Sequence, residues 1–147
     1  MRSKVLAQAN GQRTILLLLD SGEDAIKAIQ AFARDHKVSG ASLFALGAFE
    51  KASVGWFDFN TRQYRPIEVP AQCEVISVLG DVATDADGEP SVHLHAVLGL
   101  SDGTTRGGHL LRGIVRPTLE ITMTEVPAHL KRLKRPDLGI ALIDLDQ

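Results

Sequence analysis

The feature that most constrains the fold of this chain is a predicted β-hairpin within residues 91–120. Along residues 92–100, apolar side chains occupy every second position, which is typical of a strand with one buried face. Residues 101–104, Ser-Asp-Gly-Thr, then indicate a tight turn, because aspartate and glycine tolerate the positive φ angles of hairpin turns. A second strand is predicted for residues 106–115. The stretch therefore predicts two neighbouring antiparallel strands.

Three of the five histidines of the chain lie in this hairpin, with His93 and His95 on the first strand and His109 on the second. Residues two apart on a strand share a face and lie about 6.6 Å apart at Cα. The three imidazoles are therefore expected to converge, and three histidines with an open fourth position are typical of a catalytic zinc site. We predict a site for zinc or a similar divalent metal at these residues. The alternative is that they are ordinary, partly exposed strand residues.

The length of the turn decides whether His109 can join the other two histidines. With a two-residue loop, His95 would oppose Leu110, and His109 would point to the other face because a slip of one residue flips every side chain. A three-residue loop, or a β-bulge at Gly107 and Gly108, restores the alignment. The metal hypothesis thus predicts an irregularity between residues 101 and 109.

Composition and length favour an ordinary cytoplasmic protein of one domain. Hydrophobic residues make up 44% and charged residues 23% of the 147 residues, which is usual for a globular domain. The net charge of −2 excludes a chain-wide electrostatic attraction to nucleic acid. The single cysteine, Cys73, excludes an internal disulfide and favours a reducing compartment. The apolar run at residues 15–19 is too short for a signal-peptide core or a membrane span, so no membrane is expected as a partner.

Residues 23–35 form the best predicted helix, with Ile26 and Ile29 in its apolar stripe. The remaining segments are short, rich in β-branched and aromatic residues, and separated by turn signals. They are residues 13–19, 41–49, 54–59, 63–69, 73–83 and 118–126. With the hairpin we expect about seven strands, mostly antiparallel because the connections are short. The predicted class is α+β, a curled sheet with one long helix packed on it.

Beyond a core at about residues 12–126, residues 127–147 are expected to hold a basic segment and an apolar tail. The basic residues are Lys131, Arg132, Lys134 and Arg135. Such a segment is either a solvated surface or an arm that contacts nucleic-acid phosphates. The tail, residues 138–145, is apolar enough to dock on the body or on a neighbouring subunit.

Several segments, taken in order, resemble one family. They are residues 47–49 (Gly-Ala-Phe), 52–58, 74–80, 93–95 (His-Leu-His), 107–110 (Gly-Gly-His-Leu) and 117–120 (Pro-Thr-Leu-Glu). In this order they resemble the PPC domain, which is found in plant AT-hook nuclear proteins and as stand-alone bacterial and archaeal proteins. The resemblance implies a compact α+β homotrimer with a fold likeness to acetolactate decarboxylase, a metal-dependent enzyme with histidine ligands.

The resemblance also bears on the site. Prokaryotic members that keep these histidines are implied to bind a zinc-like ion with them, and this chain keeps His93, His95 and His109. Plant members are DNA-associated through a separate hook with an Arg-Gly-Arg-Pro core. The nearest segment here, Lys-Arg-Pro at residues 134–136, lacks the glycine of that core.

These observations leave three functions open. The first is a stand-alone PPC homotrimer that is DNA-associated or regulatory and binds a metal, with a small-molecule ligand as a further candidate partner. The second is a metal-dependent lyase or hydrolase acting on a small carbonyl acid, with Glu120 as acid, base or partner of a ligand histidine. Glu120 is alternatively a surface carboxylate paired with Arg112 or Arg116. The third is a structural trimer whose histidines only hold the core or the interface together.

Overall fold

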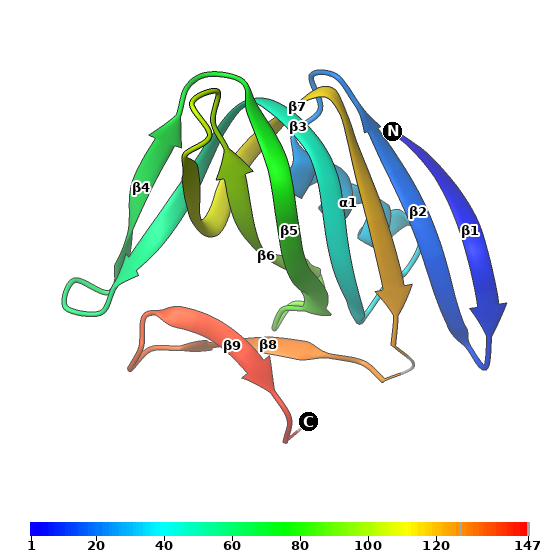
Figure 1. Ribbon diagram of the computed structural model, residues 1–147. Coiled ribbons are helices and arrows are strands. Elements are labelled where there is room, and N and C mark those ends of the chain that lie inside the picture. Colours follow the sequence, from blue (N-terminus) through cyan, green and yellow to red (C-terminus); the bar gives the residue numbers. More distant parts are fainter. Residues whose placement is uncertain (127, 147) are drawn as a thin grey trace.

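Strands dominate the architecture in the computed structural model, which describes residues 1–126 and 128–146 (Figure 1). They are β1 (Arg2–Ala9), β2 (Gln12–Asp20), β3 (Ala41–Asp58), β4 (Gln63–Val69), β5 (Cys73–Thr84), β6 (Pro90–Gly99), β7 (Thr105–Glu125), β8 (Lys131–Arg135) and β9 (Ile140–Asp144). A helix, α1 (Ala25–Asp35), follows β2. Strands account for 66% and helix for 8% of these described residues. Within the described residues, no helix has the length and apolar content needed to cross a bilayer.

The predicted α+β class with about seven strands and a long helix is therefore wrong. α1 has only 11 residues, and nine strands of the described part of the chain form one mixed sheet. Two pairs of predicted strands are continuous, because β3 runs for 18 residues and β7 for 21. Gly47 bends β3 instead of ending it. A Cβ atom there would lie 2.3 Å from the Thr118 carbonyl oxygen, so glycine permits the close approach of β7.

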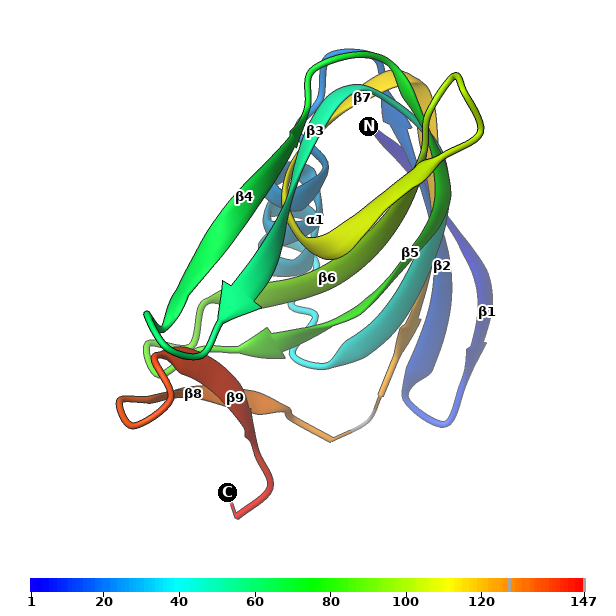
Figure 2. The ribbon, with the colours of Figure 1, turned by 60° about the vertical axis from the view of Figure 1, so that its left-hand side comes forward.

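The C-terminal residues that were predicted to hold a basic segment and an apolar tail form the hairpin β8–β9. β8 joins the sheet through one parallel pair, Thr84 of β5 with Lys131, which makes the sheet mixed. The two short strands cross beneath the ends of the larger sheet (Figures 1 and 2).

The long bent strands allow the sheet to curl back on itself. β7 pairs with β3 along both halves of each strand, β3 pairs with β5, and β6 bridges β5 to β7. The pairings thus close a ring of four strands, with β2 and β1 continuing the sheet on one side. β4 pairs with β3 as an edge strand, a position that tolerates its Pro66 because proline cannot donate a ladder hydrogen bond.

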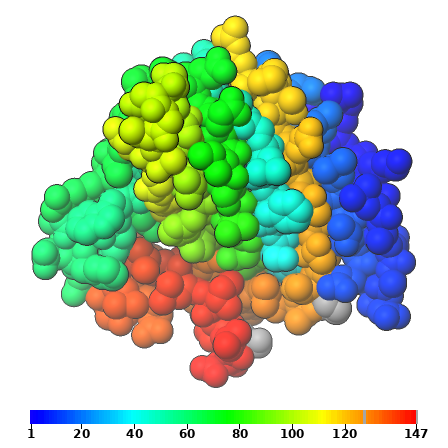
Figure 3. Space-filling view, viewed as in Figure 1, coloured from blue at the N-terminus to red at the C-terminus, as the bar shows by residue number. Residues whose placement is uncertain are grey.

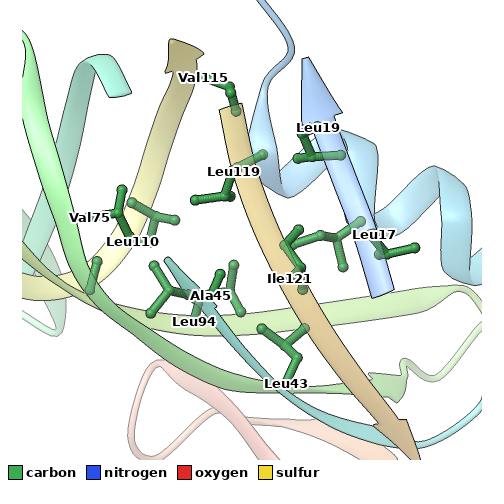
Figure 4. Packing of buried hydrophobic residues seen from close by; sticks show 14 of the residues in the cluster. Leu17, Leu19, Leu43, Ala45, Val75, Leu94, Leu110, Val115, Leu119 and Ile121 are labelled. Carbon is green, nitrogen blue, oxygen red and sulfur yellow. The ribbon is translucent and has the colours of Figure 1, made fainter. Parts of the chain in front are cut away.

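The hydrophobic core fills the inside of this curl, where α1 packs against β6 and β7 (Figures 2 and 4). Buried side chains labelled in Figure 4 include Leu17, Leu43, Leu94, Leu110, Leu119 and Ile121. Burying a side chain of this size stabilises the fold by about 1.5–3 kcal/mol. Leu94, Ala96 and Leu98 of β6 are all inside. The residues that alternate with them, including His93 and His95, therefore point outward.

Candidate metal centre

The loop between β6 and β7 determines the face on which His109 lies. The Leu100 amide donates to the Thr104 carbonyl oxygen over 2.8 Å, which leaves a three-residue loop, residues 101–103. Gly103 takes a φ of 80°, as such a loop requires. His95 is consequently paired with His109 across the two strands, in a ladder without a register shift. The predicted irregularity is confirmed and lies in the loop, not in a bulge at the paired glycines.

The three histidines form a compact cluster on the outer surface of the ring. Ring centroids are 5.1 Å apart for His93 and His95, 5.1 Å for His93 and His109, and 5.5 Å for His95 and His109. One nitrogen from each ring lies within 4.8 Å of the other two. The three histidines that the sequence analysis predicted to converge therefore lie together within one chain.

His93 faces an acidic residue of the neighbouring strand. Asp81 of β5 is its pairing partner, and the Asp81 Oδ2 atom lies 3.7 Å from His93 Nδ1. Arg132 of β8 donates a hydrogen bond to the other oxygen of Asp81. Burial alone would raise the pKa of Asp81, but the hydrogen bonds and charges of His93 and Arg132 outweigh it and lower the pKa. A carboxylate beside Nδ1 favours a proton on that nitrogen and leaves Nε2 of His93 able to bind a metal.

His109 is half-buried, and its ring stacks on Tyr64 with centroids 4.6 Å apart. Burial lowers the pKa of His109 to about 4, and His93, His95 and Arg132 add to the effect. Its Nδ1 atom is buried with no hydrogen-bond partner among the described residues. A buried unpaired nitrogen costs about 1–3 kcal/mol. A neutral imidazole with an unsatisfied nitrogen beside two further imidazoles fits a metal ligand set.

The cluster opens into a pocket of about 410 Å³. β6 and β7 supply the histidines and Val92, β4 supplies Tyr64, and the C-terminal hairpin supplies the opposite wall. The lining residues of that wall are Arg132, Gly139, Ile140, Ala141 and Leu142. Figure 3 shows this hairpin packed below the body of the sheet. A volume of this size suits a small organic molecule.

Glu120, the predicted acid or base, does not line this pocket. It is exposed on the far half of β7, paired with Leu46 of β3 and Leu18 of β2.

The four basic residues of β8 do not form one surface. Arg132 is only 6% exposed and points to Asp81, whereas Lys131, Lys134 and Arg135 are exposed. Arg135 lies 3.3 Å from the carboxylate of Asp137. Arg132 therefore belongs to the pocket, whereas the other three basic residues lie on the surface.

The fold and the site together define a class of protein: strand-dominated domains that carry a three-histidine pocket on their outer surface. The chain belongs to the Plants and Prokaryotes Conserved (PCC) domain family, whose sequence profile matches residues 6–127. The predicted resemblance to the PPC domain is thereby confirmed.

Solved structures agree with this assignment. A plant- and prokaryote-conserved protein from Pyrococcus horikoshii is 32% identical, with a TM-score of 0.84 over 90% of this chain and 91% of that chain. A candidate DNA-binding protein from Ralstonia eutropha is 29% identical, with a TM-score of 0.83 over 89% and 90%. A metal-containing protein from Archaeoglobus fulgidus is 27% identical, with a TM-score of 0.81 over 97% and 96%.

The predicted fold likeness to acetolactate decarboxylase is also confirmed. The enzyme from Bacillus subtilis has a TM-score of 0.58 at 14% identity, and the match covers 89% of this chain and 61% of that chain. At this identity the likeness concerns the fold alone. No protein of curated function matches the chain.

Proposed function

We propose that this PPC-domain protein binds a zinc-like divalent metal ion through His93, His95 and His109. The observation that carries the proposal is the convergence of three ring nitrogens within 4.8 Å, one of the rings being His109 with an unsatisfied Nδ1. Asp81 would position His93, and Tyr64 would hold the ring of His109 by stacking. The metal-containing relative from Archaeoglobus fulgidus supports the proposal.

The chemistry that best suits this pocket is a metal-dependent lyase or hydrolase reaction on a small carbonyl acid. A bound divalent ion would polarise a carbonyl group or lower the pKa of a water molecule. The chain itself supplies a pocket of about 410 Å³ to hold the substrate and the Arg132 guanidinium to attract an acid group. Glu120 lies outside this lining, so we assign it no part in the reaction.

Cobalt(II) titration tests the metal proposal, because ligation by three histidines gives the ion a strong visible spectrum in a low-symmetry site. We expect wild-type protein to bind one cobalt per chain and to release it to zinc. His95→Ala should abolish the spectrum, whereas His129→Ala, an exposed histidine outside the cluster, should leave it unchanged. An unchanged spectrum in His95→Ala would refute the site.

A DNA-associated or regulatory role is the second candidate, favoured by the relative from Ralstonia eutropha. In this chain Lys131, Lys134 and Arg135 are the exposed basic residues of β8 that are available to test it. Reversing their charges should weaken DNA binding and flatten its salt dependence. Binding that survives this change would refute a contact through β8.

We further propose that the protein assembles as a homotrimer. Three apolar side chains on the outer face support assembly: Phe44 is 51%, Leu79 61% and Val97 42% exposed. Phe44 pairs with Leu79, and Leu79 pairs with His95, so this apolar surface adjoins the histidines. Light scattering should give a mass three times that of the chain, and a monomer mass would refute the trimer.

A further inference from the structure

The C-terminal hairpin lies outside the segment that matches the family, which ends at residue 127. It nevertheless provides half of the residues that line the histidine pocket. The ligand-facing wall of the pocket is therefore built by the C-terminal hairpin, beyond the residues that the family profile matches.

Contacts at both ends fix the hairpin against the body. At its start, the Leu130 carbonyl oxygen accepts hydrogen bonds from the Thr84 amide over 2.8 Å and the Thr84 hydroxyl over 3.1 Å. At its tip, Gly139 sits so close to the β3–β4 turn that a Cβ atom would lie 2.9 Å from Cβ of Arg62. The hairpin is thus a preformed wall, and its shape can select a ligand.

Arg132 is the charged group that this wall brings into the pocket. Its guanidinium donates to the Ser91 carbonyl oxygen over 3.1 Å, to the Ser91 hydroxyl over 3.2 Å and to Asp81. A guanidinium has five N–H donors. Three of them are used by described residues, so the buried and rigidly held side chain keeps donors for a ligand.

The charge balance of the pocket favours an anion. Asp81 offsets the charge of Arg132, and imidazoles add no charge when they bind a metal, because they bind it in their neutral form. A divalent ion held by these imidazoles would leave the pocket with a net positive charge in a partly desolvated space. Val92, Ile140 and Leu142 supply the apolar part of the lining.

We propose that the histidine pocket binds a short-chain carboxylate, with its carboxylate between the metal and Arg132 and its apolar body against Ile140 and Leu142. This inference rests on the proposed metal site. It assigns the C-terminal hairpin as the element that determines ligand specificity.

Calorimetry on zinc-loaded protein tests this assignment, with isobutyrate as the probe and isobutyramide as its neutral isostere. We expect isobutyrate to bind at least about tenfold more tightly, because charged hydrogen bonds are about twice as strong as neutral ones. Arg132→Gln should remove this preference while zinc stoichiometry stays the same. Equal binding of the two probes, or an unchanged preference in Arg132→Gln, would overturn the proposal.

A second variant keeps the test independent of Arg132, whose removal leaves Asp81 without that partner. Leu142→Trp should fill the pocket and abolish isobutyrate binding, whereas Leu145→Trp, at a residue that is 84% exposed and outside the lining, should not. Isobutyrate binding that survives Leu142→Trp would contradict the placement of the ligand. A protein that takes up no zinc refutes the metal site itself, and one that takes up zinc without preferring isobutyrate refutes only the anion site.

Discussion

Acid should destabilise the metal-free protein through His109. Burial, assisted by the neighbouring histidines and Arg132, lowers the pKa of this residue from 6.5 to about 4 in the folded state. In the unfolded chain the imidazole regains its ordinary pKa. Between these values the unfolded chain binds a proton that the folded protein does not bind. Stability is therefore fully present above about pH 6.5 and is lost as the pH falls toward about 4.

The expected size follows from the same values. The difference between 6.5 and about 4, at about 1.4 kcal/mol per pH unit, amounts to about 3 kcal/mol. About 2 kcal/mol of it should be lost between about pH 7 and about pH 5. This is a large share of the roughly 5–15 kcal/mol that stabilises a typical domain.

Urea unfolding followed by circular dichroism measures this effect, in the presence of a chelator and at one protein concentration. His109→Phe is the matched variant, because it keeps an aromatic ring against Tyr64 and removes the titrating group. The pH-dependent loss should be about 2 kcal/mol smaller in the variant than in the wild type. Equal losses in both proteins would show that burial does not hold His109 in its neutral form.

Three further predictions concern the surroundings of the site. Asp81→Asn should weaken zinc binding about 10–100-fold in a chelator competition, because His93 loses its carboxylate partner. Asp87→Asn, in an exposed turn, should leave zinc binding unchanged. Equal zinc affinities of the two variants would contradict the role of Asp81. Gly108→Ala should lower the free energy of unfolding by about 1–3 kcal/mol, since its Cβ atom would lie 2.5 Å from the Gly55 carbonyl oxygen. Gly107→Ala should cost less, because the corresponding distance to the Ala96 oxygen is 3.2 Å, and the reverse order in urea melts would be inconsistent with this packing. Leu79→Glu should dissociate the proposed trimer, as measured by light scattering, whereas Leu145→Glu should leave it intact. A trimer that persists in Leu79→Glu would exclude the apolar surface around Leu79 from the interface.

The histidine cluster could be predicted because its determinants are local. Alternation along β6 placed His93 and His95 on one face, and the turn chemistry around Gly103 set the register that brings His109 beside them. The alternation and the turn both lie within a few residues of the histidines that they position.

The partners of the cluster could not be predicted, because they come from distant parts of the chain. Asp81 and Arg132 meet only after β5, β6 and the C-terminal hairpin have assembled. A weak signal existed for Asp81, since it interrupts the apolar run at residues 78–83. For Arg132, the charge of the surrounding residues indicated solvent, although alternate residues of a strand face opposite sides.

The lengths of the strands were misjudged for a related reason. A strand was predicted to end at residue 49, but β3 bends at Gly47 and continues beside β7, which allows the sheet to close. Glycine marks both breaks and bends in strands, and the approach of Thr118, which decides between them, is a contact between distant residues.

The central claim, that His93, His95 and His109 hold a metal ion, is tested most directly by elemental analysis of protein purified without a histidine tag. The wild type should contain close to one zinc-like ion per chain, and the triple variant His93→Ala, His95→Ala, His109→Ala should contain none. Metal missing from both proteins after zinc is supplied, or retained by the triple variant, would contradict the proposed site.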